Sequence, residues 1–149
     1  MSKVFEDLFM EIQEDMIVAG LDFVDEVADK IYIYGSQEGR LSVGDCFFEV
    51  NGDVYTRTEL KELSDDYYAC DKKETICIRT LTNDVSKMDD LCKEYDRPMP
   101  TEIKMVYDVK KGSLSVDYKY ELVYMNKKDL YATDIVEQWY NEVKQSLSK

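Results

Sequence analysis

The stretch "IKMVYDVKKGSLSVDYKY", residues 103–120, predicts a β-hairpin. Apolar and aromatic residues alternate with polar ones on both sides of a Lys-Lys-Gly-Ser turn, which is the spacing of side chains along a strand. One face of this hairpin should carry Ile103, Met105, Tyr107, Val109, Leu114, Val116, Tyr118 and Tyr120. Two strands joined by a short turn must pair antiparallel, so the hairpin points to an antiparallel sheet.

Three further strands are expected upstream of this hairpin, at residues 30–34, 40–50 and 54–58. The sequence "NGD" at 51–53 suits a tight turn between the last two, because Asn-Gly accepts positive φ angles. Within "RLSVGDCFFEV" the alternation changes phase near Gly44, which predicts a β-bulge there. "GSQEG" at 35–39 suits the turn that follows the first strand.

Helices are predicted before, between and after these strands. Residues 3–19 place apolar side chains three and four positions apart, and Gly20 follows where a helix commonly stops. A second amphipathic helix is expected over 71–95, ended by Pro98 and Pro100, and a third begins near Asp134. The segment 59–70 has no clear period.

The expected order is therefore helix, three strands, helix, two strands, helix. This is an α+β fold (α-βββ-α-ββ-α) with an antiparallel sheet of about five strands. The helices are expected to pack on one face of the sheet, leaving the other at least partly open. The length of 149 residues predicts a single domain over 1–149.

The net charge is strongly negative. Nineteen Lys and Arg against thirty-two Asp and Glu give −13, and the pI is near 4.4. Such a charge repels nucleic acid and anionic membranes and favours basic protein partners. The alternative is that acidity only keeps the protein soluble. Acids interrupt the N-terminal apolar pattern and no run approaches the roughly 20 residues of a membrane span, so we expect a cytoplasmic protein.

Catalytic and metal-binding motifs are missing from the sequence. Without histidine, neither a Ser-His-Asp nor a Cys-His system can form. Cys46, Cys70, Cys77 and Cys92 form no C-x-x-C pair, and free thiols are expected rather than zinc ligands or disulfides. We therefore expect no enzyme, cofactor or metal. The alternative, an enzyme with a divalent metal on clustered carboxylates, ranks last.

"SDDYYACD", residues 64–71, differs from its surroundings because its two tyrosines lie between acids, outside a regular pattern. Tyrosine gives a large contact area at a small entropic cost, so an acid-flanked pair suits an interface with a basic partner. A plain solvated loop or helix start is the alternative.

The N-terminal "FEDLFMEIQEDM", the hairpin "DKIYIYGSQEGRLSVGDCFFEV" and the hairpin "TEIKMVYDVKKGSLSVDYKYE" together resemble the YezG-like family of bacterial immunity proteins, or a related immunity family. The resemblance implies neutralisation of a cognate polymorphic toxin, often a nuclease, by a stoichiometric complex that occludes it. An acidic adaptor for another basic protein is the alternative. From charge and position outside the apolar pattern, we predict the contact residues Asp65, Asp66, Tyr67, Tyr68, Asp89, Asp90 and Glu94.

Overall fold

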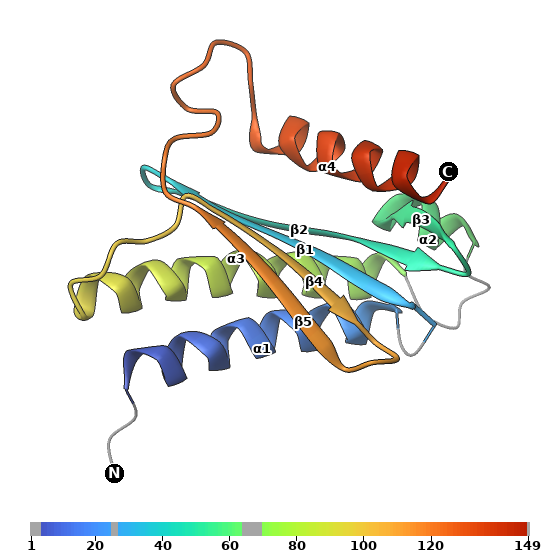
Figure 1. Cartoon of the computed structure of the whole chain (residues 1–149), viewed down its shortest axis with the longest axis horizontal. Coiled ribbons are helices and arrows are strands. Elements are labelled where there is room, and N and C mark those ends of the chain that lie inside the picture. The colour runs from blue at the N-terminus through green and yellow to red at the C-terminus, as the bar shows by residue number, and fades with distance from the viewer. Residues whose placement is uncertain (1–3, 25–26, 64–69, 149) are drawn as a thin grey trace.

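The structure, a computed structural model, describes residues 4–24, 27–63 and 70–148 (Figure 1). Its elements in chain order are α1 (Phe5–Val24), β1 (Lys30–Glu38), β2 (Leu41–Val50), β3 (Asp53–Thr56), α2 (Arg57–Leu63), α3 (Asp71–Glu94), β4 (Glu102–Asp108), β5 (Ser113–Lys119) and α4 (Ala132–Leu147). Helix α2, of seven residues, begins at Arg57, so the strand predicted over 54–58 ends two residues early, and the helix continues into the segment for which the sequence predicted no element.

The five strands form one antiparallel sheet in the order β3-β2-β1-β4-β5. The C-terminal hairpin forms as predicted, with Met105 opposite Val116 and Tyr107 opposite Leu114. The α+β class, the antiparallel sheet and the order α-βββ-α-ββ-α are thus confirmed. Strand β1 is central because it pairs with β2 on one side and with β4 on the other.

The helices cover both faces of the sheet, so the expectation of one covered face is wrong. Helices α1 and α3 pack on the face that carries Ile31 and Ile33, whereas α4 packs on the face that carries Tyr32 and Tyr34 (Figure 1). The physical reason is that α4 has its own apolar stripe, and α1 and α3 already cover the first face. Trp139 of α4 meets Tyr32 edge-on, with ring centroids 5.7 Å apart.

The second face remains open over β5, whereas Val106 of the adjacent β4 packs against the core below α4. Ser115 and Asp117 of β5 alternate with Leu114 and Val116, which pack toward the first core. These two polar residues are exposed. The expectation of a partly open face therefore holds for this edge of the sheet only.

The predicted bulge at Gly44 is absent from the pairing of β1 with β2. The register runs without interruption from Lys30 opposite Glu49 to Glu38 opposite Leu41. The change of phase arises because both faces are buried, so apolar residues occur at odd and even positions of β2. Gly44 instead permits a close helix contact, since a Cβ there would lie 2.6 Å from the backbone carbonyl carbon of Leu81 in α3.

Gly20 is likewise a packing residue and not the end of a helix. Helix α1 continues to Val24, and a Cβ on Gly20 would come within 2.9 Å of Ile31 Cγ2. Strand β1 also extends beyond the prediction, through Glu38, and turns at Gly39, whose φ is +59°. Helix α3 agrees closely with the predicted 71–95.

The long connection between β5 and α4 is held by one buried carboxylate. Glu38 is 1% exposed and accepts hydrogen bonds from the backbone N–H groups of Val123, Tyr124 and Met125. The Tyr124 hydroxyl also lies 2.8 Å from Ser36 Oγ. A connection without regular structure is thus attached firmly to the end of β1.

The four cysteines are free thiols, with Cys70 exposed and the other three buried. Cys46 Sγ of β2 and Cys77 Sγ of α3 lie 3.8 Å apart. Within residues 4–24, 27–63 and 70–148, no helix combines the length and the apolar character needed to cross a bilayer.

Candidate functional site

Two hollows on opposite faces of the sheet are candidates for a functional site, each of about 440 Å³. We call the first the α4 pocket; it lies between β2, the β3–α2 junction and α4. We call the second the α1/α3 groove; it lies between those two helices. The two hollows are distinguished by the charged side chains that line them.

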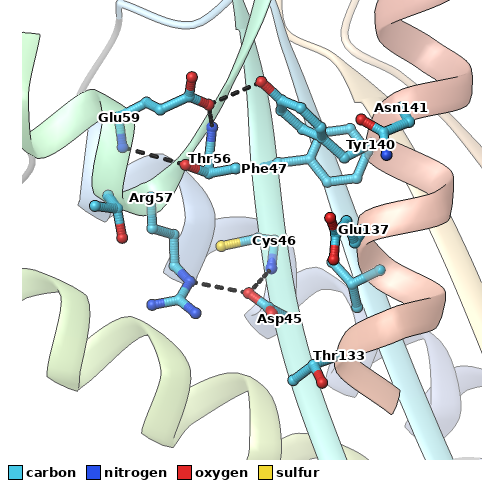
Figure 2. Close-up of a pocket in the computed structure, with 12 residues that line it drawn as sticks. Asp45, Cys46, Phe47, Thr56, Arg57, Glu59, Thr133, Glu137, Tyr140 and Asn141 are labelled. Atoms are coloured by element: carbon cyan, nitrogen blue, oxygen red, sulfur yellow. Dashed lines mark hydrogen bonds and ion pairs between the residues drawn. The ribbon is translucent and has the colours of Figure 1, made fainter. Parts of the chain in front are cut away.

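The α4 pocket holds charged groups that already have partners (Figure 2). The guanidinium of Arg57, at the start of α2, donates from Nε to Asp45 Oδ1 at 2.9 Å and from Nη1 to Glu74 Oε2 at 2.5 Å. Lys61 Nζ adds a contact of 2.7 Å to Glu74 Oε1. These ion pairs join α2 to β2 and to α3.

The carboxylate of Glu59, on the other wall of the α4 pocket, also has hydrogen-bond partners. It accepts hydrogen bonds from the Thr56 backbone N–H at 2.9 Å and from the Tyr140 hydroxyl at 2.8 Å (Figure 2). Burial alone would raise the pKa of Glu59, but these hydrogen bonds outweigh it and lower the pKa. These contacts make the pocket a junction that fixes α2 and α4, and they engage both Arg57 and Glu59.

The α1/α3 groove has an apolar floor and an acidic wall. Leu8 and Ile12 of α1 and Leu91 of α3 are buried or half-buried and line it. Its acidic residues are Glu11, Asp15, Asp84, Asp90 and Glu94, and its one basic residue is Lys87. A second hollow, of about 380 Å³, continues along the same helices and shares Asp15.

Helix α1 contributes charge of one sign only. Over residues 5–24 it carries Glu6, Asp7, Glu11, Glu14, Asp15 and Asp22, and no Lys or Arg. Helix α3 balances its acids with basic residues elsewhere on its surface, but only Lys87 reaches the groove. The groove is therefore a local concentration of the protein's negative charge.

Asp84 is the least expected residue of the α1/α3 groove. Its side chain is 2% exposed, and its Oδ1 lies 3.7 Å from Lys87 Nζ. Its Oδ2 is buried and accepts no hydrogen bond from the described residues. Burial, reinforced by the neighbouring Asp15 carboxyl, raises the pKa of Asp84 to about 7. The carboxyl groups of Asp15 and Asp84, from two different helices, thus face each other and can hydrogen-bond only while one of them holds a proton.

A metal ion does not fit this groove. Across the part of the chain that the structure describes, no group of three or more His, Cys, Asp or Glu side chains is arranged to hold one. Carboxylate sites for Mg²⁺ or Ca²⁺ need several oxygens converging on one point. The groove suits a cationic group that brings its own hydrogen-bond donors.

The structure divides the predicted contact residues into three groups. Asp90 and Glu94 lie in the α1/α3 groove. Asp89 does not line it and pairs with Lys93 at 2.9 Å. The remaining four, Asp65, Asp66, Tyr67 and Tyr68, lie outside the described residues.

Sequence reasoning missed Asp15 and Asp84, although a signal for the second was present. Asp84 falls three positions after Leu81 and four before Met88, within the apolar stripe of α3. A carboxyl in that stripe is unexpected and could have identified it. Asp15 offers no such signal, because it becomes part of a site only when α1 packs against α3.

Comparison of the chain with protein-family models, and separately with curated proteins, finds no match.

Proposed function

We propose that this protein is an immunity protein, which binds a basic toxin domain in the cytoplasm of the producing cell and neutralises it by stoichiometric occlusion. The single observation that carries the proposal is the α1/α3 groove, which combines an apolar floor with an excess of carboxylates. The resemblance of the sequence to YezG-like immunity proteins supports the same conclusion.

The proposed mechanism is electrostatic capture followed by occlusion. A nuclease domain holds phosphate with Lys and Arg, so its active face attracts an acidic protein and can be covered by it. The net charge of −13 would accelerate the encounter at low salt, and the apolar floor would slow dissociation. Inhibition in this scheme needs no turnover and no catalytic residue.

The test asks first whether a toxin domain is encoded beside this gene, and then measures the binding of that domain and the rescue of growth when both proteins are expressed. A triple variant, Asp15→Asn with Asp90→Asn and Glu94→Gln, removes three charges from the α1/α3 groove. We expect its affinity to fall at least about tenfold at low salt, because each exposed interface charge contributes a fraction of a kcal/mol to about 1 kcal/mol.

The matched control removes three exposed charges elsewhere, through Asp117→Asn, Glu121→Gln and Asp129→Asn. Its affinity should change by no more than about threefold, the effect of net charge alone. Equal losses in both variants would show that charge matters only globally, and would remove the groove from the proposal. A tight complex with a basic protein that has no toxic activity would establish the adaptor function instead.

A further inference from the structure

We propose that the partner adds a β-strand to the outer edge of β5, antiparallel to it, with basic side chains on the side of that strand that faces α1. This inference rests on the proposed function, because it names the kind of segment by which a basic partner is held. Main-chain hydrogen bonds would then fix the partner in one register, which attraction between net charges cannot do.

Strand β5 has an unpaired outer edge. It is the last strand of the sheet and pairs only with β4 among the described elements (Figure 1). Its pairing runs without interruption from Ser113 to Lys119, and this stretch contains no proline, so neither of two common devices that blunt an edge is present. At the opposite end of the sheet, β3 has only four residues and leads directly into α2. The edge of β5 is therefore the better suited of the two to accept a further strand.

The backbone groups that point outward from this edge can be identified from the register. Val109, just after β4, donates its N–H to the carbonyl of Asp29, just before β1. Because successive residues of a strand direct their backbone groups to opposite sides, odd-numbered residues of β4 bond to β1 and even-numbered ones to β5. Even-numbered residues of β4 lie opposite odd-numbered residues of β5. The N–H and C=O groups of Leu114, Val116 and Tyr118 therefore point away from the sheet, where no described strand pairs with them.

Apolar side chains accompany this edge on the face covered by α1. Leu114 and Val116 are half-buried and Tyr118 is 41% exposed, so a neighbouring strand would cover apolar area that now meets water. Helix α1 lies beside this row, because the Gln13 side chain donates a hydrogen bond of 2.6 Å to the Tyr118 hydroxyl. The ring centroids of Phe9 and Tyr118 are 6.3 Å apart. A strand added to β5 would thus have one row of its side chains next to α1.

Helix α1 determines which occupant fits, because its charged residues are all acidic. Met10 and Glu14 are exposed on the flank of α1 beyond Gln13, away from the α1/α3 groove. A long basic side chain on the added strand can lay its methylene stem along Met10 and bring its charge toward Glu14. A second copy of this chain fits less well, since pairing of two β5 edges would bring two acidic α1 helices together.

The other face of β5 places little demand on the partner. Ser115 and Asp117 are exposed there, and no helix covers them. An exposed cross-strand pair with Asp117 would change the affinity by about threefold or less. Specificity should therefore come from the backbone groups and from the side that faces α1.

The first experiment needs no toxin. The probe is the peptide acetyl-Thr-Arg-Thr-Val-Thr-Arg-Thr-amide, which as a strand carries Arg, Val and Arg on one side and Thr on the other. It is titrated into the full-length protein and followed by NMR, and we expect binding in the millimolar range. Hydrogen exchange at the amides of Leu114, Val116 and Tyr118 should slow about tenfold when the peptide is at about ten times its Kd.

Three modified peptides test the backbone and the charge separately on the wild-type protein. N-methylation at the second, fourth and sixth residues removes the N–H groups that would face β5 in an antiparallel pair, and should weaken binding at least about tenfold. N-methylation at the third and fifth residues removes N–H groups that face water, and should change the affinity by less than about threefold. Glutamate in place of both arginines should abolish binding. Equal binding of the two methylated peptides, or undiminished binding of the glutamate peptide, would overturn the proposal.

Two variants at one position complement the peptides. Val116→Pro removes an outward N–H, and an edge strand tolerates proline where its N–H faces solvent. It should weaken binding of the arginine peptide at least about tenfold, whereas Val116→Ala keeps the N–H and should stay within about threefold. If Val116→Pro does not fold, the methylated peptides decide the question on the wild type. A wild-type dimer that Val116→Pro dissociates would make a second copy the occupant and overturn the proposal.

Binding to a toxin domain encoded beside this gene separates this inference from the proposed function. If the toxin binds the wild type and Val116→Pro equally, the immunity function stands and the strand-addition site is wrong. If the arginine peptide binds the edge of β5 but no such toxin binds the protein, the site stands and the toxin assignment is wrong.

Discussion

Replacement of Asp84 by asparagine should stabilise the free protein at neutral and higher pH. Folding raises the pKa of this carboxyl from 3.8 to about 7, because the group is buried beside Asp15. Between these two pH values the folded protein binds more protons than the unfolded chain. The stability from the protonated group is therefore fully present below pH 3.8 and is lost as pH rises through about 7.

The magnitude follows from the size of the shift. Each unit of pKa corresponds to about 1.4 kcal/mol, so a shift of about three units sets an upper limit of about 4 kcal/mol at alkaline pH. Rearrangement of the Asp15 side chain toward water will reduce this, and we expect a gain on the order of 2 kcal/mol. Asparagine keeps the shape and adds an N–H donor for Asp15, so little packing energy is lost. The contact with the exposed Lys87 is worth less than about 1 kcal/mol.

The assay is urea unfolding of wild type and Asp84→Asn, followed by circular dichroism at several pH values from about 4.5 to about 8.5. The difference in free energy of unfolding should be small at the acid end and should grow in favour of the variant as pH rises. Asp89→Asn serves as the control, because Asp89 is paired with Lys93 and should show no such trend. A difference that is constant across this range, or a variant less stable than wild type at every pH, would refute the reasoning.

Three further changes test the fold. Gly44→Ala should destabilise the protein by about 2 kcal/mol or more in thermal unfolding, because its Cβ would meet the Leu81 backbone at 2.6 Å. Glu38→Gln should cost about 2 kcal/mol and accelerate hydrogen exchange at the amides of residues 123–125, which lose an ionised acceptor. Trp139→Ala should cost about 3 to 5 kcal/mol in urea unfolding and remove the tryptophan contribution to the near-ultraviolet dichroism, because it removes the contact of α4 with Tyr32. Unchanged stability in any of these variants would contradict the packing described for that residue.

The sequence predicted the strand order along the chain well, because alternation and turn chemistry are local. The C-terminal hairpin is the clearest example, since its register follows from residues 103–120 alone. The placement of α4 could not be predicted in the same way. Strand β2 alternates toward both faces, and one local pattern cannot distinguish a bulge from a strand buried on both sides.

The other wrong predictions concern glycine. In a sequence, a glycine that ends a helix or forms a bulge cannot be distinguished from one that allows close packing. Gly20 and Gly44 suggested a helix end and a bulge, respectively, and both instead allow close packing of helices on the sheet. The candidate site was predicted only in part, because part of it also depends on packing between elements distant in the sequence. Asp90 and Glu94 are visible as surface acids, whereas the facing of Asp15 and Asp84 depends on how two distant helices pack.

The central position of β1 has a consequence for how the chain must fold. One edge of β1 pairs with β2 through a turn at Gly39. The other edge can pair only after β4 has been synthesised, because Ser36 lies opposite Glu102 and Lys30 lies opposite Asp108. During synthesis, strand β1 therefore keeps an unpaired edge until residues 102–108 have left the ribosome. Such late, long-range pairing slows folding and exposes a surface on which nascent chains can aggregate. A chaperone that covers residues 30–38 during synthesis should therefore raise the yield of folded protein.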